Sequence, residues 1–210
     1  MMRQSSETNR AAAMTPELLI AFATYAFVTS ITPGPNNTML LASGANFGFG
    51  PTVPNILGIS LGFAAMVLAV GLGAGALFVA FPLAHDILRY GGALYLMVLA
   101  WRLARSGGAG TAEAGARPLT FLEAAAFQWI NPKAWIMAVG AVATYTPEAG
   151  YLLNVVIVTI VFALINGPCV SVWAGFGTAL RGVLANPVRL RIFNIAMALL
   201  LVASLYPMLA

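Results

Sequence analysis

The sequence predicts an all-α membrane protein with six transmembrane helices, arranged as two inverted repeats of three helices each. Of the 210 residues, 60% are hydrophobic and only 8% are charged, whereas soluble domains are about 25% charged. The mean hydropathy is +0.90. Apolar stretches near the length that crosses a bilayer, about 20 residues, recur along the chain, and two of them are interrupted by asparagine and proline. With so few charges, most of the surface must face lipid.

The chain begins with residues 1–13, which are polar and then alanine-rich, without the charged-then-apolar order of a signal peptide. Two interpretations stay open for them: a short disordered tail, or a natural start at Met14. Residues 14–210 then form a single membrane domain. Its apolar segments lie at about residues 18–45, 53–81, 87–103, 121–145, 151–176 and 192–209.

The first segment is interrupted by six consecutive residues, Thr32, Pro33, Gly34, Pro35, Asn36 and Asn37. Proline lacks the backbone N–H and clashes with the preceding helical turn, so the helix must break here. Asparagine is a good N-cap, and we expect a new helix to begin at Asn36 or Asn37. Its N-terminal N–H groups would suit a carboxylate. The alternative is a simple proline kink whose asparagines hold neighbouring helices together.

The second segment is rich in glycine, and Gly58 and Gly62 have the spacing that lets two helices approach closely. The third segment is short and follows Arg89. A loop at residues 104–118, rich in glycine and alanine, then separates the first repeat, about 17–103, from the second, about 119–210.

The fourth segment repeats the interruption at Asn131, Pro132 and Lys133. Asn131 can cap a helix, Pro132 breaks one, and Lys133 is the only lysine of the chain. An ionisable residue inside a span is a functional candidate, although Lys133 could instead extend to a nearby interface. Glu123, near the start of the segment, is either interfacial or a site for a proton.

The fifth segment is glycine-rich like the second, and the sixth follows Arg189 and Arg191. An odd number of spans in each repeat makes the two halves enter the membrane in opposite senses, as in many secondary transporters. Arginines cluster after the third and fifth segments, which places both loops in the cytoplasm and both termini outside. An inside amino terminus with one re-entrant segment is the alternative.

Several classes of function lack support in the sequence. There is no nucleophile–base pair, no cluster of metal ligands and no nucleotide-binding loop, so neither an enzyme nor a cofactor is expected. The basic residues are scattered, which argues against nucleic acid as a partner. A membrane scaffold would gain nothing from interruptions at matched positions, and a channel would conduct without saturation. A homodimer through a glycine-rich face is compatible with the sequence.

The chain resembles the LysE/RhtB family of amino-acid exporters. The motifs that carry the resemblance are "TPGPNN" at residues 32–37 and "NPK" at residues 131–133, and "TYAFVTSITPGPNN" is similar to the cysteine/O-acetylserine exporter branch. The resemblance covers residues 14–210. It implies a six-helix carrier of the bacterial inner membrane that exports amino acids or derivatives in exchange for protons. From the residues themselves we expect the substrate at the two motifs, and the candidates for carrying the proton are Lys133 and Glu123.

Two departures from the family pattern bear on the substrate. Exporters of basic amino acids in this family carry an acid after an Ile-Ser pair in the second span, where this chain has Leu61. They carry another shortly after the fourth-span Asn-Pro, and residues 134–139 contain none. A cationic side chain inside lipid would need a carboxylate partner. We therefore expect a neutral amino acid or derivative, such as cysteine, O-acetylserine, homoserine or threonine.

Overall fold

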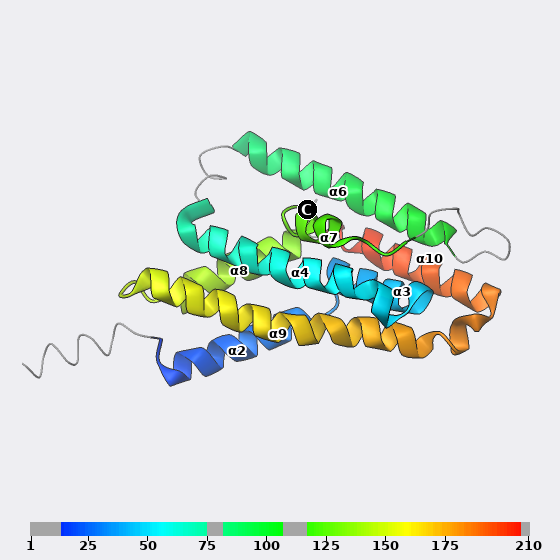
Figure 1. Cartoon of the computed structure of the whole chain (residues 1–210). Coiled ribbons are helices and arrows are strands. Elements are labelled where there is room, and N and C mark those ends of the chain that lie inside the picture. The colour runs from blue at the N-terminus through cyan, green and yellow to red at the C-terminus, as the bar shows by residue number, and fades with distance from the viewer. Residues whose placement is uncertain (1–13, 75–81, 107–116, 207–210) are drawn as a thin grey trace, which may run out of the picture.

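The computed structural model describes residues 14–74, 82–106 and 117–206, and these residues form helices and loops without a strand. The interpretations offered for residues 1–13 lie outside the described residues. So do residues 75–81, at the end of the second predicted segment, and most of the central loop. The helices (Figure 1) are α2 (Pro16–Ile31), α3 (Pro35–Phe47), α4 (Phe49–Ala69), η1 (Val70–Ala74), α6 (Pro82–Arg105), α7 (Phe121–Gln128), α8 (Pro132–Tyr145), α9 (Tyr151–Leu180), η2 (Val183–Ala185) and α10 (Pro187–Ala203).

Helix boundaries differ from the expected segments mainly in the third span of each half. α6 begins at Pro82, earlier than the expected residue 87, and has 24 residues, so it is not short. α10 begins at Pro187, where the Oδ1 of Asn186 accepts hydrogen bonds from the backbone N–H groups of Val188 and Arg189. Proline at the first helical position and an asparagine cap are strong start signals. These signals start α10 before the apolar run at about residue 192, from which the segment boundary is predicted.

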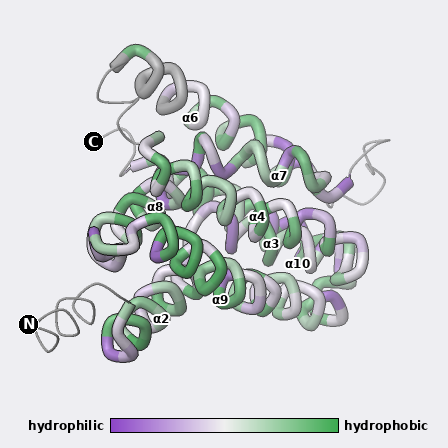
Figure 2. The backbone as a smooth tube through the Cα atoms, turned by 60° about the vertical axis from the view of Figure 1, so that its left-hand side comes forward, coloured by the Kyte–Doolittle hydropathy of each residue, from purple (hydrophilic) through white to green (hydrophobic). Residues whose placement is uncertain are grey.

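Within the described residues, two helices are long and apolar enough to cross a membrane by themselves, α4 continued by η1 (Phe49–Ala74) and α9. A third candidate span is the pair α2 and α3, which is bent by 54° at its break. Hydrophobic residues dominate the length of α9, while hydrophilic ones gather near helix ends such as the start of α2 (Figure 2). The chain is thus a helical membrane protein, and the six-span inverted repeat stays a prediction.

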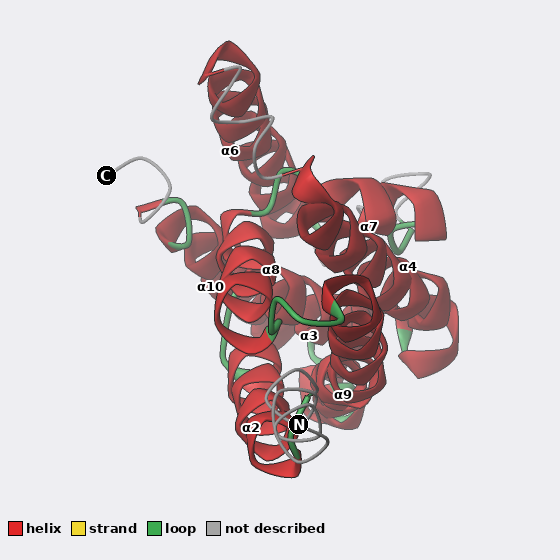
Figure 3. Cartoon of the chain, turned by 90° about the vertical axis from the view of Figure 1, so that its left-hand side faces the viewer, coloured by secondary structure: helices red, strands yellow, loops and turns green. Residues whose placement is uncertain are grey.

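The helices of the two halves pack across one another (Figure 3). α2 and α3 pack against α9, α4 packs against α7 and α9, and α6 packs mainly against α10. Gly58 and Gly62 of α4 face α7 so closely that a Cβ would collide with backbone atoms of Phe121 and Ala125. The close approach expected of this pair is therefore realised inside the chain. A homodimer stays a prediction.

The contact between α3 and α9 is equally close and also depends on glycine. A Cβ on Gly44 would meet the carbonyl of Ala174, and one on Gly177 would meet the carbonyl of Leu41. Close approach of backbones through small residues is a common way for helices to associate in lipid. The long helix α9 is thereby held against the second part of the interrupted first segment.

Two of the three apolar clusters of the described residues border both interruptions. One centres on the rings of Phe22, Phe63 and Phe162. The rings of Phe63 and Phe162 meet edge to face, with their centroids 4.8 Å apart. The other gathers around Leu96 and Phe127, with residues of α3, α6, α7 and α10. The polar residues of the interruptions are therefore held inside an apolar bundle.

Hydrogen bonds join three helices at one end of the bundle. Asn194 of α10, fully buried, exchanges hydrogen bonds with Asn46 of α3 at 2.8 and 3.0 Å. Its Nδ2 also donates to the carbonyl of Ser106, just after α6, at 2.9 Å. α6 and α9 both end, and α10 begins, at this end of the molecule (Figure 1). The arginines at the end of α6 and those after α9 therefore lie at the same end of the molecule, and the cytoplasmic location of that end stays a prediction.

We predict that Gly177→Val disrupts the contact of α3 with α9. The added methyl groups would collide with backbone atoms of Leu41 and Ala45, and overpacking of this kind costs about 1–3 kcal/mol. A lower Tm of the detergent-solubilised protein would show the loss.

The control is Gly175→Val on the same helix, because nothing lies within 4 Å of a Cβ at Gly175. The two substitutions make the same change in helix propensity. Equal Tm values for both variants would contradict the proposed packing role of Gly177.

Candidate functional site

The first interruption separates α2, which ends at Ile31, from α3, which begins at Pro35. The expectation that α3 begins at Asn36 or Asn37 is wrong, because Gly34 occupies the N-cap position and supplies no side-chain cap. Asn37 instead turns back, and its Nδ2 donates to the carbonyls of Ser30 and Thr32, both at 2.8 Å. Pro35 is suited to the first helical position. It moves the asparagines into the first turn of α3.

Carbonyl groups at the end of α2 find their donors on other helices. The indole N–H of Trp173, from α9, donates to the carbonyl of Ile31 at 3.0 Å. The ammonium of Lys133, from α8, donates to the carbonyls of Thr32 at 2.8 Å and Pro33 at 3.2 Å. It also donates to the hydroxyl of Thr32 at 2.9 Å. Backbone that a break would leave unpaired is thus satisfied by side chains.

The second interruption lies between α7 and α8. Asn131 caps α8 as expected, since its Oδ1 accepts a hydrogen bond from the backbone N–H of Lys133 at 3.1 Å. Pro132 takes the first position of the helix. Lys133 projects from the first turn of α8 to the first interruption, so it joins the two breaks.

Gly34 provides the space in which the Lys133 side chain lies. A Cβ on Gly34 would come within 2.8 Å of the Lys133 Cδ and 3.2 Å of its Nζ. The backbone of Gly34 is extended, with φ at 179°, a conformation open to any residue. Glycine is needed here for room rather than for its conformational freedom.

Gln128 and Asn36 form a second bridge, which the sequence interpretation missed. The Nδ2 of Asn36 donates to the Oε1 of Gln128 at 2.8 Å, and the Nε2 of Gln128 donates back to the Oδ1 of Asn36 at 3.2 Å. Gln128 is fully buried and ends α7. An amide inside an apolar segment three residues before Asn131 is a signal that could have singled it out.

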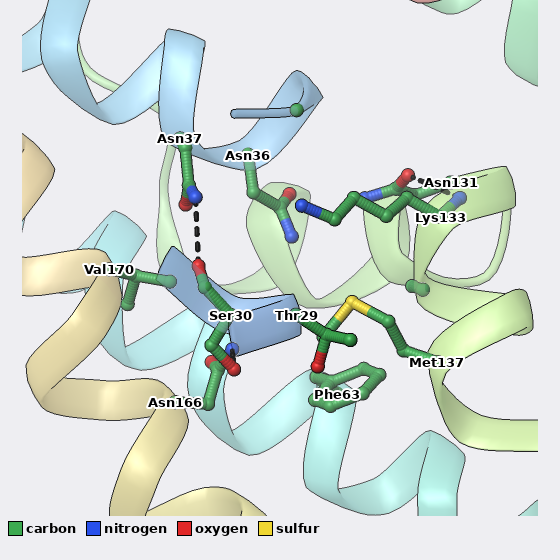
Figure 4. A pocket seen from close by; sticks show the side chains of 12 residues that line it. Thr29, Ser30, Asn36, Asn37, Phe63, Asn131, Lys133, Met137, Asn166 and Val170 are labelled. Carbon is green, nitrogen blue, oxygen red and sulfur yellow. Dashed lines mark hydrogen bonds between the residues drawn. The ribbon is translucent and has the colours of Figure 1, made fainter. Parts of the chain in front are cut away.

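A small pocket lies where the two interruptions meet (Figure 4). Both breaks contribute to it, through Gly34, Asn36 and Asn37 from the first and Asn131 and Lys133 from the second. Its volume of about 20 Å³ has room for a water molecule but not for an amino acid. The remaining lining residues are Thr29, Ser30, Phe63, Ala134, Met137, Asn166 and Val170.

Four expected site residues are not among those that line this pocket. Thr32 and Pro33 contribute the oxygens that bind Lys133, and Pro35 and Pro132 begin the two helices. Asn166 and Ser30 line the pocket although the sequence interpretation did not select them. Asn166 precedes Gly167 and Pro168, the residue types of the two breaks, and that similarity is a signal that was overlooked.

Glu123 is not among the residues that line the pocket. Its carboxylate forms a bidentate ion pair with Arg117, and both nitrogen–oxygen distances are 2.7 Å. It also accepts a hydrogen bond from the backbone N–H of Thr120 at 2.8 Å. Together with Thr120 it forms the capping box of α7. The carboxylate raises the pKa of the Arg117 guanidinium through this hydrogen bond and its charge.

Two interrupted helices that meet over a polar pocket inside an apolar bundle define a class of protein, the membrane transporter built around broken helices. The chain belongs to the family described as LysE type translocator, whose profile matches residues 27–204. The protein is therefore a transporter and not an enzyme.

Curated relatives agree with this assignment. The chain is 37% identical over 193 residues to proteins named cysteine/O-acetylserine efflux protein from Escherichia coli (strain K12) and Shigella sonnei (strain Ss046). Each alignment covers 90% of this chain and 96% of the relative. No solved structure matches the chain.

We predict that Gln128 and Asn36 are energetically coupled. Asn36→Leu leaves the Oε1 of the fully buried Gln128 without its donor, and an unsatisfied buried polar group costs about 1–3 kcal/mol. Gln128→Leu leaves the half-buried amide of Asn36 without its partner. The double variant should lose less stability than the sum of the single losses.

Thermal unfolding of the four proteins in detergent measures this coupling. Asn194→Leu serves as a control, because Asn194 is a buried amide bonded to Asn46 and Ser106 instead. Its effect should add to that of Gln128→Leu. Additive losses for Gln128 and Asn36 would show that their contact does not matter.

Proposed function

We propose that the protein is a secondary active exporter of a neutral amino acid or derivative, such as cysteine, O-acetylserine, homoserine or threonine, in the inner membrane of a bacterium. The observation that carries the proposal is the reach of Lys133 from one interruption to the other, beside the open N-terminus of α3. The curated relatives, which are named for efflux of cysteine and O-acetylserine, support it.

The substrate carboxylate binds at the N-terminus of α3 in this proposal. Gly34 gives no side-chain cap to that helix, so the backbone N–H groups of Asn36 and Asn37, two residues that line the pocket, are open and carry a partial positive charge. The N-terminus of α8 is different, because the side chain of Asn131 already accepts from it. The Lys133 ammonium adds a full positive charge beside the N-terminus of α3.

The charge of the pocket favours a neutral amino acid. Lys133 is the one ionisable side chain among the described residues that line it, and no carboxylate is among them. The second cation of lysine or arginine would be desolvated there without a partner, which is costly. Phe63, Met137 and Val170 offer an apolar wall to a short side chain.

Alternating access suits this arrangement better than an open pore. The pocket is too small for an amino acid in the described state, so passage requires the packing around it to change. A channel, and a scaffold without transport, are the alternatives that the export measurement must separate from this proposal.

We predict that cells loaded with dipeptides export the matching neutral amino acid faster when the protein is present, with a rate that saturates. Lys133→Ala should reduce export to the background rate while the protein stays in the membrane, because both the charge and the bonds to Thr32 and Pro33 are lost. Efflux and the amount of protein in isolated membranes are the measurements.

Arg189→Ala is the matched control, since it removes a cation from an exposed helix start outside the pocket. It should leave the export rate unchanged. Export that does not saturate would indicate a channel, and no acceleration for any amino acid would indicate a scaffold. Unchanged export by Lys133→Ala would rule out the role of that residue.

Exchange with protons is the second part of the proposal, and Lys133 is the carrier that the geometry favours over Glu123. Lys133 lines the pocket and holds its Nζ on the oxygens of Thr32 and Pro33, beside the place proposed for the substrate. The Glu123 carboxylate is instead engaged by Arg117 and Thr120 at the start of α7.

We predict that an inward proton gradient accelerates export by the wild-type protein and by Glu123→Gln, and that Lys133→Arg, which keeps the cation but cannot release its proton, loses this response. Glutamine keeps hydrogen-bonding ability at the capping position but cannot carry a proton. Export from proteoliposomes with and without an imposed gradient measures the response. Loss of the response in Glu123→Gln, at normal export without a gradient, would transfer the role to Glu123.

A further inference from the structure

Asn166 has an oxygen without a partner in the pocket. The residue lies on α9, is 4% exposed and lines the cavity. Its Nδ2 donates to the hydroxyl oxygen of Ser30 at 3.1 Å, but its Oδ1 has no hydrogen-bond partner in the described part of the chain. Buried acceptors are nearly always satisfied. An orphan acceptor beside a proposed binding site therefore calls for a donor from outside the chain.

Three neighbouring donors are already committed elsewhere. The Nδ2 of Asn37 donates to the carbonyls of Ser30 and Thr32. The hydroxyl of Thr29 donates to the carbonyl of Tyr25 at 2.7 Å, and the Nδ2 of Asn36 donates to Gln128. These bonds hold the walls of the pocket in place and leave the oxygen of Asn166 for a ligand.

The pocket has two chemically different sides (Figure 4). Lys133 enters from α8 with its ammonium toward the first interruption, and Asn166 faces the cavity from α9 beside Ser30. One side offers positive charge and N–H donors, and the other offers an uncharged oxygen acceptor. A zwitterion carries an acceptor and a donor group on one carbon atom, so it complements both sides at once.

We propose that the Oδ1 of Asn166 accepts a hydrogen bond from the α-ammonium of the substrate. The inference rests on the proposed export of an amino acid and deepens it. With the carboxylate at the N-terminus of α3 and the pocket widened by the change in packing that transport requires, the ammonium lies toward α9, where the amide oxygen is the unpaired acceptor. The substrate side chain then faces Phe63 and Met137. Asn166 thus selects compounds that carry the amine.

The test compares L-cysteine with 3-mercaptopropionate, which lacks the amine but keeps the carboxylate and the thiol. Purified protein in proteoliposomes exchanges reduced, labelled L-cysteine, and 3-mercaptopropionate is added as a competitor. The wild-type protein should bind 3-mercaptopropionate much more weakly than L-cysteine. Asn166→Leu should raise the KM for L-cysteine at least about tenfold, the size expected for loss of a hydrogen bond to a charged group. It should leave the inhibition by 3-mercaptopropionate nearly unchanged.

Two further variants separate recognition from folding. Asn55→Leu is the matched control, because Asn55 is a buried asparagine of α4 with an equally unpaired Oδ1 and does not line the pocket. It should keep the KM and the preference of the wild-type protein. Asn166→Asp keeps an acceptor oxygen, and it should keep the preference for L-cysteine even if Asn166→Leu is inactive.

Each outcome decides the question. An unchanged preference in Asn166→Leu, a loss of preference in Asn55→Leu as large as in Asn166→Leu, or an inactive Asn166→Asp overturns the role of Asn166. Absence of L-cysteine exchange by the wild-type protein overturns the proposed transport of this substrate and the inference with it. That result is distinguishable, because it precedes any substitution.

Discussion

One constraint governs the structure: backbone carbonyls released by a helix break inside lipid must find donors within the protein. Consecutive carbonyls at the end of α2 meet this requirement with side chains from other helices. Asn37 of α3 donates to the carbonyl of Ser30, and Trp173 of α9 donates to that of Ile31. Lys133 of α8 donates to the carbonyls of the next two residues, Thr32 and Pro33. The break is thereby a junction of α2, α3, α8 and α9.

Two kinds of contact hold the helices at and around this junction, and they differ in how easily they can break and form again. The glycine contacts of α3 with α9 and of α4 with α7 are backbone packing, which a large displacement would destroy. The bonds of Lys133 and of the Asn36–Gln128 pair instead join flexible side chains to other polar groups, which can move without displacing a backbone. Both glycine contacts join opposite halves of the sequence. The rearrangements of alternating access are therefore expected in α2 and α8 more than between the halves as rigid bodies.

The sequence alone predicts the parts of this arrangement that depend on local chemistry. Proline and asparagine in apolar segments predict both breaks, and the cap of α8 by Asn131 is confirmed. The long-range pairing of Gln128 with Asn36 could not be predicted, because a single amide in a span carries no information about its partner. The place of Asn166 in the pocket could not be predicted either, because the sequence does not show which residues of α9 face the other helices. Its neighbours Gly167 and Pro168 suggest a break, yet α9 continues through them as one helix of 30 residues.

The two breaks contain the same residue types, and the order of those residues decides what each can bind. In the second break the asparagine precedes the proline, so its side chain closes the helix that follows. In the first break the asparagines follow Pro35, which places them inside the helix and turns Asn37 back to the end of α2. The positive end of α3 is left open as a result. The order of the same residue types therefore closes the helix start at one break and leaves it open at the other, where we propose that the substrate carboxylate binds, and the single lysine lies between them.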